Sequence, residues 1–209
     1  MLETNEQNKR QEIKFVFSLR NFFTLRIEKK LKKIYPTRIV NSIYFDTNNF
    51  DFFQKSEEGL SPRKKIRVRY YNEFNNNLLL ETKITNNYYR SKFVKKISAR
   101  DFNHKSISKQ CNDYSIMPKL KISYQRDYYQ SEIGRITVDN YIMCKQISTY
   151  VNSLSNINKA YKKILDSNQV IVELKTINNF SKYEAIKFFE KNDTRMSKYC
   201  LSVQKLYNR

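Results

Sequence analysis

Three basic residues alternate with apolar ones in a short segment, and this spacing could hold phosphate. In residues 65–70, the side chains of Lys65, Arg67 and Arg69 share one face of an extended chain, and apolar side chains occupy the other face. Two arginines at positions i and i+2 offer planar donor forks that fit phosphate oxygens. A solvated outer face would mix lysine with glutamate and threonine, so the segment predicts a cationic interior.

Three further segments each place one acid and one base on the same strand face. The pairs are Glu12 with Lys14, Glu81 with Lys83, and Glu173 with Lys175. For any one of them, a salt bridge on a polar surface is the commoner role. Three such segments, together with Arg67, Arg69, Arg126 and Arg135 on other strands, favour an interior that all of them share.

An interior of this kind calls for a polyanion and a metal ion. Like charges repel strongly in a low dielectric unless other charges complete the site. The arginines and lysines would hold phosphoryl oxygens, and the carboxylates would bind a hard cation that bridges those oxygens. The chain has only two glycines, Gly59 and Gly134, and it contains no P-loop or kinase motif that could do this instead.

The elements that must position these residues are mainly strands. A period of two, typical of strands, recurs in eight segments. They are Glu12–Phe17, Ser42–Thr47, Lys64–Tyr71, Leu78–Ile84, Lys92–Ile97, Lys119–Tyr129, Arg135–Ile142 and Val170–Thr176. Eight strands can close into a barrel whose interior is just wide enough for side chains or one small ligand.

Helices are expected around this sheet. Apolar residues from Leu19 to Ile34 recur at helical spacing, which predicts one helix that stops at Pro36. Ser181 and Glu184 have the spacing of a capping box for a second helix, and residues 196–206 could form a third. We therefore predict an α+β fold, an eight-stranded antiparallel β-barrel with flanking helices, formed by residues 1–209 as a single domain.

Composition excludes several other classes of protein. The cysteines Cys111, Cys144 and Cys200 lack CxxC spacing, and a single histidine, His104, cannot build a zinc site with them. No apolar run approaches the roughly 18 residues of a membrane span. We expect a cytoplasmic protein that reaches the inner face of a membrane only through a partner.

The net charge indicates a polyanionic ligand without identifying it. The chain has 40 Lys and Arg against 20 Asp and Glu, a formal charge of +20. Nucleic acid, acidic membrane and polyphosphate would all be attracted. Runs such as residues 29–33 are more simply explained as solvated faces.

The segments that carry these residues resemble a known family in their order and spacing. They are 12–15 (EIKF), 42–47 (SIYFDT), 63–71 (RKKIRVRYY), 80–83 (LETK), 124–126 (YQR), 135–139 (RITVD), 172–175 (VELK) and 197–199 (SKY). The chain resembles the vacuolar transporter chaperone (VTC) branch of the CYTH-like triphosphate tunnel metalloenzymes, the polyphosphate polymerase domain. The segment 12–14 carries only part of the ExExK hallmark of the simpler triphosphatases.

The resemblance implies an eight-stranded tunnel in which the terminal phosphoryl group of ATP is transferred to polyphosphate with Mn²⁺ or Mg²⁺. It implies that phosphate is bound by Lys14, Arg67, Arg69, Lys83, Lys92, Arg126, Arg135 and Lys198. Of these, Arg67, Arg69, Lys83, Arg126, Arg135 and Lys198 are the expected catalytic residues. The metal ligand is expected to be Glu173, with Glu12 and Glu81 as further candidates. Arg90 and Lys95 compete with Lys92, because residues 86–96 have no unique register.

Other functions remain open at this point. Water as the acceptor would make the protein a triphosphatase, and an internal hydroxyl would make it a nucleotide cyclase. A non-catalytic binder of polyphosphate or nucleic acid is less favoured, because the glutamates would oppose simple polyanion binding. The expected partners are ATP and polyphosphate or triphosphate, with a separately encoded membrane protein as a candidate, and no specific nucleic acid is expected.

Several residues have a structural explanation as well as a functional one. Tyr70, Tyr71, Tyr128 and Tyr129 are expected to form barrel wall rather than to stack on bases. Asp46 and Asp139 could bind metal, but hydrogen bonding at strand ends is the commoner use of aspartate in such places.

Overall fold

One curled antiparallel sheet forms the body of the protein. The computed structural model describes residues 11–74, 77–87, 89–147, 160–176 and 180–209. The strands are β1 (Glu12–Ser18), β2 (Lys32–Asp46), β3 (Arg63–Tyr71), β4 (Leu78–Thr85), β5 (Arg90–Ile97), β6 (Met117–Ser131), β7 (Gly134–Gln146), β8 (Lys162–Lys163) and β9 (Gln169–Thr176). Their order is β1-β9-β7-β6-β2-β3-β4-β5, and β8 pairs with β7 outside this path. The predicted α+β class and the eight antiparallel strands of the main path are confirmed.

The sheet is open, so the prediction of a closed barrel needs correction. Within the described residues, the path ends at β1 and β5, and no ladder joins these two strands. The free edge of β1 is occupied instead by a later segment of the chain. The amide of Thr194 donates to the carbonyl of Lys14 at 2.7 Å, and Lys14 Nζ donates to the carbonyl of Met196 at 3.0 Å. This segment thus satisfies the carbonyl of Lys14, a backbone group that a closing strand would otherwise pair with.

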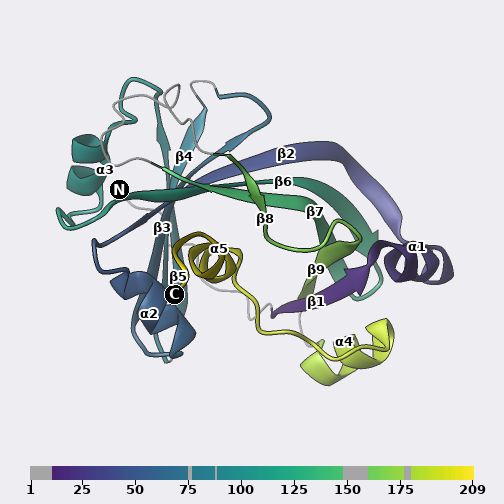
Figure 1. Cartoon of the computed structure of the whole chain (residues 1–209). Helices are drawn as coiled ribbons and strands as arrows, with labels where there is room; N and C mark the ends of the chain where they lie inside the picture. The colour runs from purple at the N-terminus through teal and green to yellow at the C-terminus, as the bar shows by residue number, and fades with distance from the viewer. Residues whose placement is uncertain (1–10, 75–76, 88, 148–159, 177–179) are drawn as a thin grey trace.

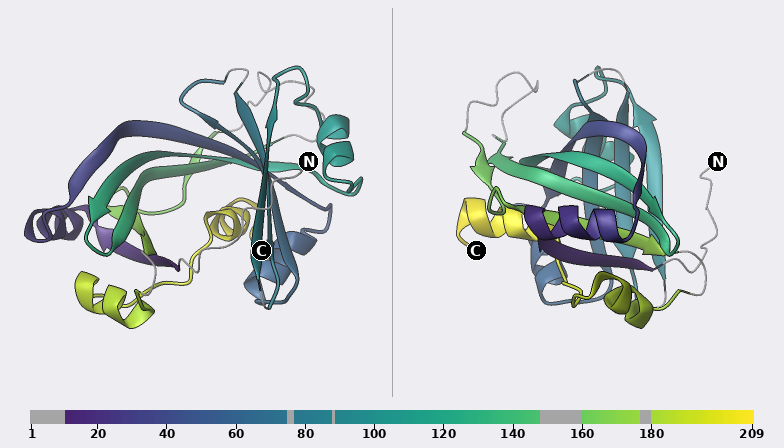
Figure 2. Two further views of the ribbon diagram at one scale, coloured as in Figure 1. Left: turned by 180° about the vertical axis from the view of Figure 1, so that it is seen from behind. Right: turned by 90° about the vertical axis from the view of Figure 1, so that its right-hand side faces the viewer.

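In the described part of the chain, five helices accompany the sheet (Figures 1 and 2). They are α1 (Leu19–Glu28), α2 (Asp51–Glu57), α3 (His104–Gln110), α4 (Lys182–Phe189) and α5 (Lys198–Tyr207). The last helix, α5, lies inside the curve of the sheet, whereas α1 and α4 lie outside it. The capping box predicted for α4 is present, because Ser181 and Glu184 exchange side-chain hydrogen bonds with each other's backbone.

Alternation along the strands gives the sheet two different faces, an outer face and an inner face. On β9, Val170, Val172 and Leu174 are fully buried against residues of α1 and α4. Ile171 points to the opposite face, where it belongs to the apolar cluster that includes α5. The residues after Ile171 on that face are Glu173 and Lys175, so the fold directs their charges inward.

The first helix is shorter than its apolar spacing predicts. It ends at Glu28, Lys30 adopts a left-handed conformation with φ of 48°, and β2 begins at Lys32. Pro36 therefore lies within a strand. It is tolerated there because residues 32–39 of β2 pair only with β6, and the pairing is irregular on both sides of the proline.

Among the residues that the structure describes, none of the helices combines the length and apolar composition that crossing a bilayer requires.

Candidate functional site

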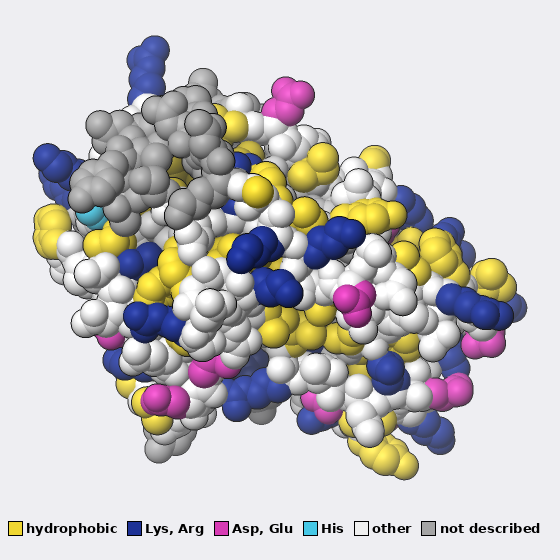
Figure 3. Space-filling view, in the orientation of Figure 1, with side chains coloured by type: hydrophobic (Ala, Val, Ile, Leu, Met, Phe, Trp, Pro, Cys, Tyr) yellow, Lys and Arg dark blue, Asp and Glu magenta, His cyan; other side chains and the backbone are white. Residues whose placement is uncertain are grey.

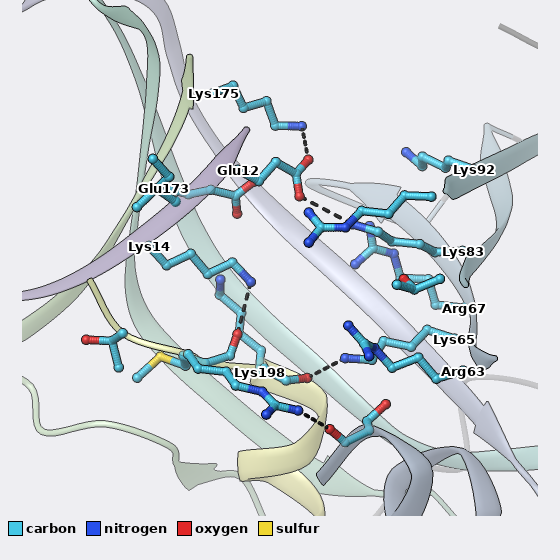
Figure 4. A pocket seen from close by; sticks show the side chains of 18 of the residues that line it. Glu12, Lys14, Arg63, Lys65, Arg67, Lys83, Lys92, Glu173, Lys175 and Lys198 are labelled. Carbon is cyan, nitrogen blue, oxygen red and sulfur yellow. Dashed lines mark hydrogen bonds and ion pairs between the residues drawn. The ribbon is translucent and has the colours of Figure 1, made fainter. Parts of the chain in front are cut away.

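A large charged cavity occupies the inner face of the sheet. It has a volume of about 1070 Å³ and is lined by β1, β3, β4, β5, β6 and β9, together with the segment that leads from α4 into α5. Thirteen lysines and arginines but only five carboxylates are among its described lining residues. Basic side chains reach into it from opposite walls (Figure 4). In the view of Figure 3, Lys and Arg side chains are spread over the side of the molecule that is shown.

Strand β3 supplies the central arginines of the cavity. Arg67 and Arg69 line it, whereas Ile66 and Val68 are fully buried in the apolar layer on the other side of the sheet. This is the arrangement that the alternation of the segment predicts. A one-residue slip of β3 would bury the guanidinium groups among apolar side chains, so the pattern fixes the register strongly.

Glu81 on β4 is the counter-ion of three of these cations. Its carboxylate accepts from Arg67 Nε at 2.6 Å and from Lys92 Nζ at 2.7 Å, and it lies 3.7 Å from Arg69. Only 4% of the residue is exposed. Burial by itself would raise the pKa of Glu81, but Arg67, Arg69 and Lys92 outweigh it and lower the pKa to about 2.

Asp139 on β7 holds two further cations. Arg126 binds it bidentately, with Nε and NH2 at 2.6 and 2.7 Å from the two oxygens, and Lys198 Nζ lies 2.6 Å away. Asp139 is completely buried. Burial would raise its pKa, but Lys198 and Arg126 lower the value to about 2. Asp139 thus joins α5 to the sheet and is a counter-ion rather than an available metal ligand.

Glu12 on β1 joins the two sides of the open sheet. Its carboxylate lies 2.9 Å from Lys175 on β9 and 3.3 Å from Lys83 on β4, and Figure 4 shows it between these two lysines. Burial would raise the pKa of Glu12, but Lys83 and Lys175 lower it to about 2. The ion pair with Lys83 connects β1 to the far side of the sheet, where no hydrogen-bonded ladder exists.

Glu173 differs from the other cavity carboxylates. It lies opposite Lys14 in the β1–β9 register, and it has no ion pair or hydrogen bond to another described residue. The described residues also contain no group of three His, Cys, Asp or Glu side chains that could hold a metal by themselves. Mn²⁺ or Mg²⁺ would suit this arrangement, because such ions are often held by one or two carboxylates together with substrate phosphates.

A second group of cations lies toward α2. Lys65 Nζ donates to the hydroxyl of Ser197 at 2.9 Å, Arg195 NH2 donates to the carbonyl of Ser56 at 3.1 Å, and Arg63 reaches only backbone carbonyls. None of these three has a carboxylate partner among the described residues. Burial lowers the pKa of Lys65, and burial together with Arg195 and Arg90 lowers the pKa of Arg63.

The α5 helix is anchored beside these groups by a buried tyrosine. The hydroxyl of Tyr199 donates to Asp46 at 2.5 Å, and its ring stacks on Tyr44 with centroids 4.9 Å apart. Tyr44 in turn accepts from Arg67 NH1 at 2.9 Å. Asp46 also accepts from the amides of Phe52 and Phe53 at the start of α2. Its carboxylate is therefore occupied by the protein, as its position at a strand end indicated.

Most of the predicted site residues line this cavity. They are Glu12, Lys14, Arg67, Arg69, Glu81, Lys83, Lys92, Arg126, Glu173 and Lys198. Arg135 does not. Its strand position faces the same side as Asp139, but it is exposed at the end of β7, next to the turn, and it lies outside the cavity. Of the three residues left open on β5, Lys92 and Arg90 line the cavity and Lys95 does not.

Sequence reasoning left several residues of the cavity out of the predicted site. The alternation places Lys65 on the face of Arg67 and Arg69, although Lys65 is not among the phosphate-binding residues that the resemblance implies, and Arg63 continues the same pattern. Arg195 lies in an irregular segment and gives no periodic signal. The role of Asp139 as a counter-ion shared by Arg126 and Lys198 could not be predicted without knowing where α5 packs.

The chain matches a known protein family over most of its length. A family model described as the VTC domain matches residues 9–104 and 98–207. No curated protein has a significant sequence match to the chain.

Solved structures share the fold at low sequence identity. A proposed adenylate cyclase from Bacillus halodurans aligns with a TM-score of 0.53 and 12% identity over 95% of this chain and 97% of that one. A proposed adenylate cyclase from Vibrio parahaemolyticus gives 0.53 and 10% over 94% and 98%. The PH1012 protein of Pyrococcus horikoshii gives 0.53 and 12% over 91% and 98%. At these identities the likeness concerns the fold.

Proposed function

This chain belongs to the VTC domain family, and from that premise we propose that it is a metal-dependent phosphotransferase that extends polyphosphate with the terminal phosphoryl group of ATP. In this reaction the bond between the terminal phosphorus of ATP and its bridging oxygen breaks. A bond forms between that phosphorus and a terminal oxygen of the polyphosphate chain, and ADP leaves.

The observation that supports this proposal is the excess of cations in the cavity. Thirteen basic side chains face five carboxylates there, and three of those carboxylates, Glu12, Glu81 and Asp193, are already paired with lysine or arginine. Cations held this close in a partly buried space repel one another unless a polyanion lies between them. A triphosphate or a longer phosphate chain supplies several negative charges along a line, which suits a cavity with basic side chains on opposite walls.

The preorganised cations would do most of the chemistry. Phosphoryl transfer depends mainly on positioning and on stabilising charge on the phosphoryl oxygens. We assign these oxygens to Lys14, Arg67, Arg69, Lys83, Lys92, Arg126 and Lys198. Arg135 is not included, because it lies outside the cavity. Glu81 and Asp139 would hold the side chains of Arg67 and Arg126 in place before the substrate arrives.

Glu173 would bind the metal ion, since its carboxylate is free of ion pairs in the described part of the chain. When bound beside Glu173, a divalent ion would help to neutralise the negative charge of the phosphoryl group. The basic residues around the metal ion would orient the accepting end of the polyphosphate chain.

Product analysis tests the proposal. Purified protein is incubated with ATP and Mn²⁺, and the products are separated by gel electrophoresis and by an orthophosphate assay. We expect a phosphate polymer and ADP. Orthophosphate without polymer would instead indicate a triphosphatase, cyclic AMP a cyclase, and no turnover a binding protein, and each of these results would overturn the assignment.

A matched pair of variants ties the activity to the cavity. Arg67→Ala is expected to lower the rate by about 10²-fold or more, the scale for loss of one preorganised charge-stabilising donor. Lys64→Ala removes a neighbouring charge on the opposite face of the same strand, where Lys64 pairs with Asp113, and should leave the rate within about twofold. Equal rates for both variants would separate the activity from this cavity.

A further inference from the structure

An arginine surrounded by three tyrosine rings lies at one end of the inner face. The guanidinium carbon of Arg38 is 5.9 Å from the ring centroids of Tyr35, Tyr71 and Tyr128. The rings of Tyr35 and Tyr128 meet edge to face, with centroids 5.7 Å apart and an interplanar angle of 89°. These four residues come from β2, β3 and β6, and we call them the tyrosine platform.

The tyrosine platform adjoins the charged cavity along the strands, although none of its four residues lines the cavity. Arg38 lies opposite Arg126 in the β2–β6 register. Tyr128 is two residues beyond Arg126 on β6, and Tyr71 is two residues beyond Arg69 on β3, so both share the inward face of a cavity arginine. The groups also influence one another electrostatically. Burial raises the pKa of Tyr128, and Arg126 and Arg38 act against that rise.

Apart from its contacts with the three tyrosine rings, Arg38 has few interactions within the fold. This residue is exposed and, in the described part of the chain, has no hydrogen bond or ion pair. Its position opposite Arg126 is unfavourable, because like charges directly opposite in a ladder repel. Asp139 neutralises Arg126 but has no bond to Arg38. An unpaired cation in this position is explained better by a ligand than by a contribution to stability.

The backbone beneath the tyrosine platform is held firmly. The amide of Ile39 donates to Asn72 Oδ1 at 3.0 Å, and the amide of Asn72 donates to the carbonyl of Ile39 at 2.8 Å. Thr37 donates to Asp127 at 2.6 Å. These bonds fix Arg38 between β3 and β6, so the rings form a preorganised surface although Tyr35 is 50% exposed.

We propose that the tyrosine platform binds the base of the nucleoside triphosphate whose phosphates occupy the cavity. The inference rests on the proposed function, since it requires a nucleotide substrate. Planar bases stack on tyrosine rings and on guanidinium planes, and such stacking tolerates different bases. The α-phosphate would then lie near Arg69 and Arg126, and the terminal phosphate would point toward Lys65 and Arg195. The sequence predicted that Tyr71 and Tyr128 form part of the barrel wall, and this proposal gives them a role in base binding instead. Tyr70 and Tyr129, which carried the same prediction, are buried.

The test compares a ligand that has a base with one that lacks it. Binding of the β,γ-imido analogue of ATP and of tripolyphosphate, both with Mg²⁺, is measured by calorimetry for the wild type, Tyr35→Ala and Tyr128→Leu. We expect the ATP analogue to bind about tenfold or more weakly to each variant, the scale for loss of one stacking side chain. Tripolyphosphate should bind within about twofold of the wild type. Tyr128→Phe keeps the ring and should restore affinity, and Tyr114→Ala, at an exposed tyrosine elsewhere, is the control.

The outcomes separate this inference from the function on which it rests. Suppose that the wild type binds both ligands, and that the variants lose affinity equally for both or keep their affinity for both. The tyrosine platform then does not recognise a base, although the phosphate site stands. If the wild type binds neither ligand, the proposed function fails and this inference fails with it. Fluorescence of 2-aminopurine riboside triphosphate gives a second readout: stacking should quench it on the wild type and much less on Tyr128→Leu.

Discussion

The carboxylates of the site differ in how many cations each one meets. Glu81 meets three, Asp139 and Glu12 meet two each, and Glu173 meets none at ion-pair distance among the described residues. The first three therefore fix the directions of basic side chains. Glu173 is left for a different task, which the following substitution tests.

Glu173→Gln should change the metal requirement and leave stability nearly unchanged. The neutral amide is a poorer ligand for a hard cation. The variant should therefore need much more Mn²⁺ to reach its maximal rate, and that maximal rate should be far below the wild-type rate. The melting temperature should stay close to that of the wild type because no ion pair is lost. Glu81→Gln provides the contrast: it leaves Arg67, Arg69 and Lys92 without their shared counter-ion and should lower the melting temperature. An unshifted Mn²⁺ titration for Glu173→Gln would end the assignment.

Asp139→Asn should change how stability depends on acid. The folded-state pKa of Asp139 is about 2, below its ordinary value of 3.8. Its contribution is therefore fully present above pH 4 and is lost as pH falls toward 2. At pH 7 we expect the substitution to cost about 3–5 kcal/mol, the range for breaking a buried pair. Urea unfolding at several pH values should show this deficit shrinking by about 2 kcal/mol between pH 5 and pH 2. A deficit that is constant over this range would contradict the pairing.

At the level of elements, the site depends on β7, which forms a hairpin with β6 and pairs with β9 on its other side. Gly134 begins β7 directly after the turn and lies opposite Thr176 of β9. Its φ is 144°, and an added Cβ would lie 2.2 Å from the carbonyl oxygen of Lys175. The neighbouring backbone, unlike a flexible side chain, cannot move aside cheaply.

Gly134→Ala should therefore destabilise the protein by about 1–3 kcal/mol or more, from backbone strain and from separation of β7 and β9. Urea unfolding at pH 7 measures this change. Glu132→Ala, in the same turn but exposed, should change the free energy of unfolding by less than about 0.5 kcal/mol. A Gly134→Ala protein as stable as Glu132→Ala would show that the two strands can move apart without cost.

For the whole molecule, the formal charge of +20 and the charged cavity are separate properties. Charges on the outer surface are screened by salt, whereas those in a partly enclosed space are screened less. The protein should thus attract many polyanions weakly and hold phosphate chains more firmly.

Salt should separate the two kinds of binding. Between about 0.05 and 0.2 M salt, an oligonucleotide bound to outer charges should lose about 10³-fold or more in affinity. Tripolyphosphate in the cavity should lose considerably less. The measurement is the fluorescence anisotropy of a labelled oligonucleotide, with tripolyphosphate as competitor, at each salt concentration. Strong retention of the oligonucleotide at 0.2 M salt would favour a nucleic-acid binder over the proposed enzyme.

Local alternation made much of the site predictable. It placed Arg67 and Glu173 on inward faces because a strand has two faces and the apolar residues claim one of them. Alternation gives a face but not a distance along the strand, so it could not show that Arg135 lies beyond the cavity.

Distant packing decided what local patterns could not. The open edge of the sheet at β1 is instead bound by residues 194–196, which lie about 180 residues away in sequence. The end of α1 depended on the pairing of β2 with β6, which tolerates Pro36 within a strand. Neither feature has a signature within one segment.

The bond between Asp46 and Tyr199 has a consequence for how the protein is made. These two residues are 153 positions apart, and a ribosome adds roughly 5–20 residues per second. The last strand of the cavity, β9, ends at Thr176, so the full set of cavity strands precedes Tyr199 in synthesis by only about one to five seconds. Activity should be absent from any chain released before Tyr199 has been added, even though most of the phosphate-binding residues have been synthesised by then.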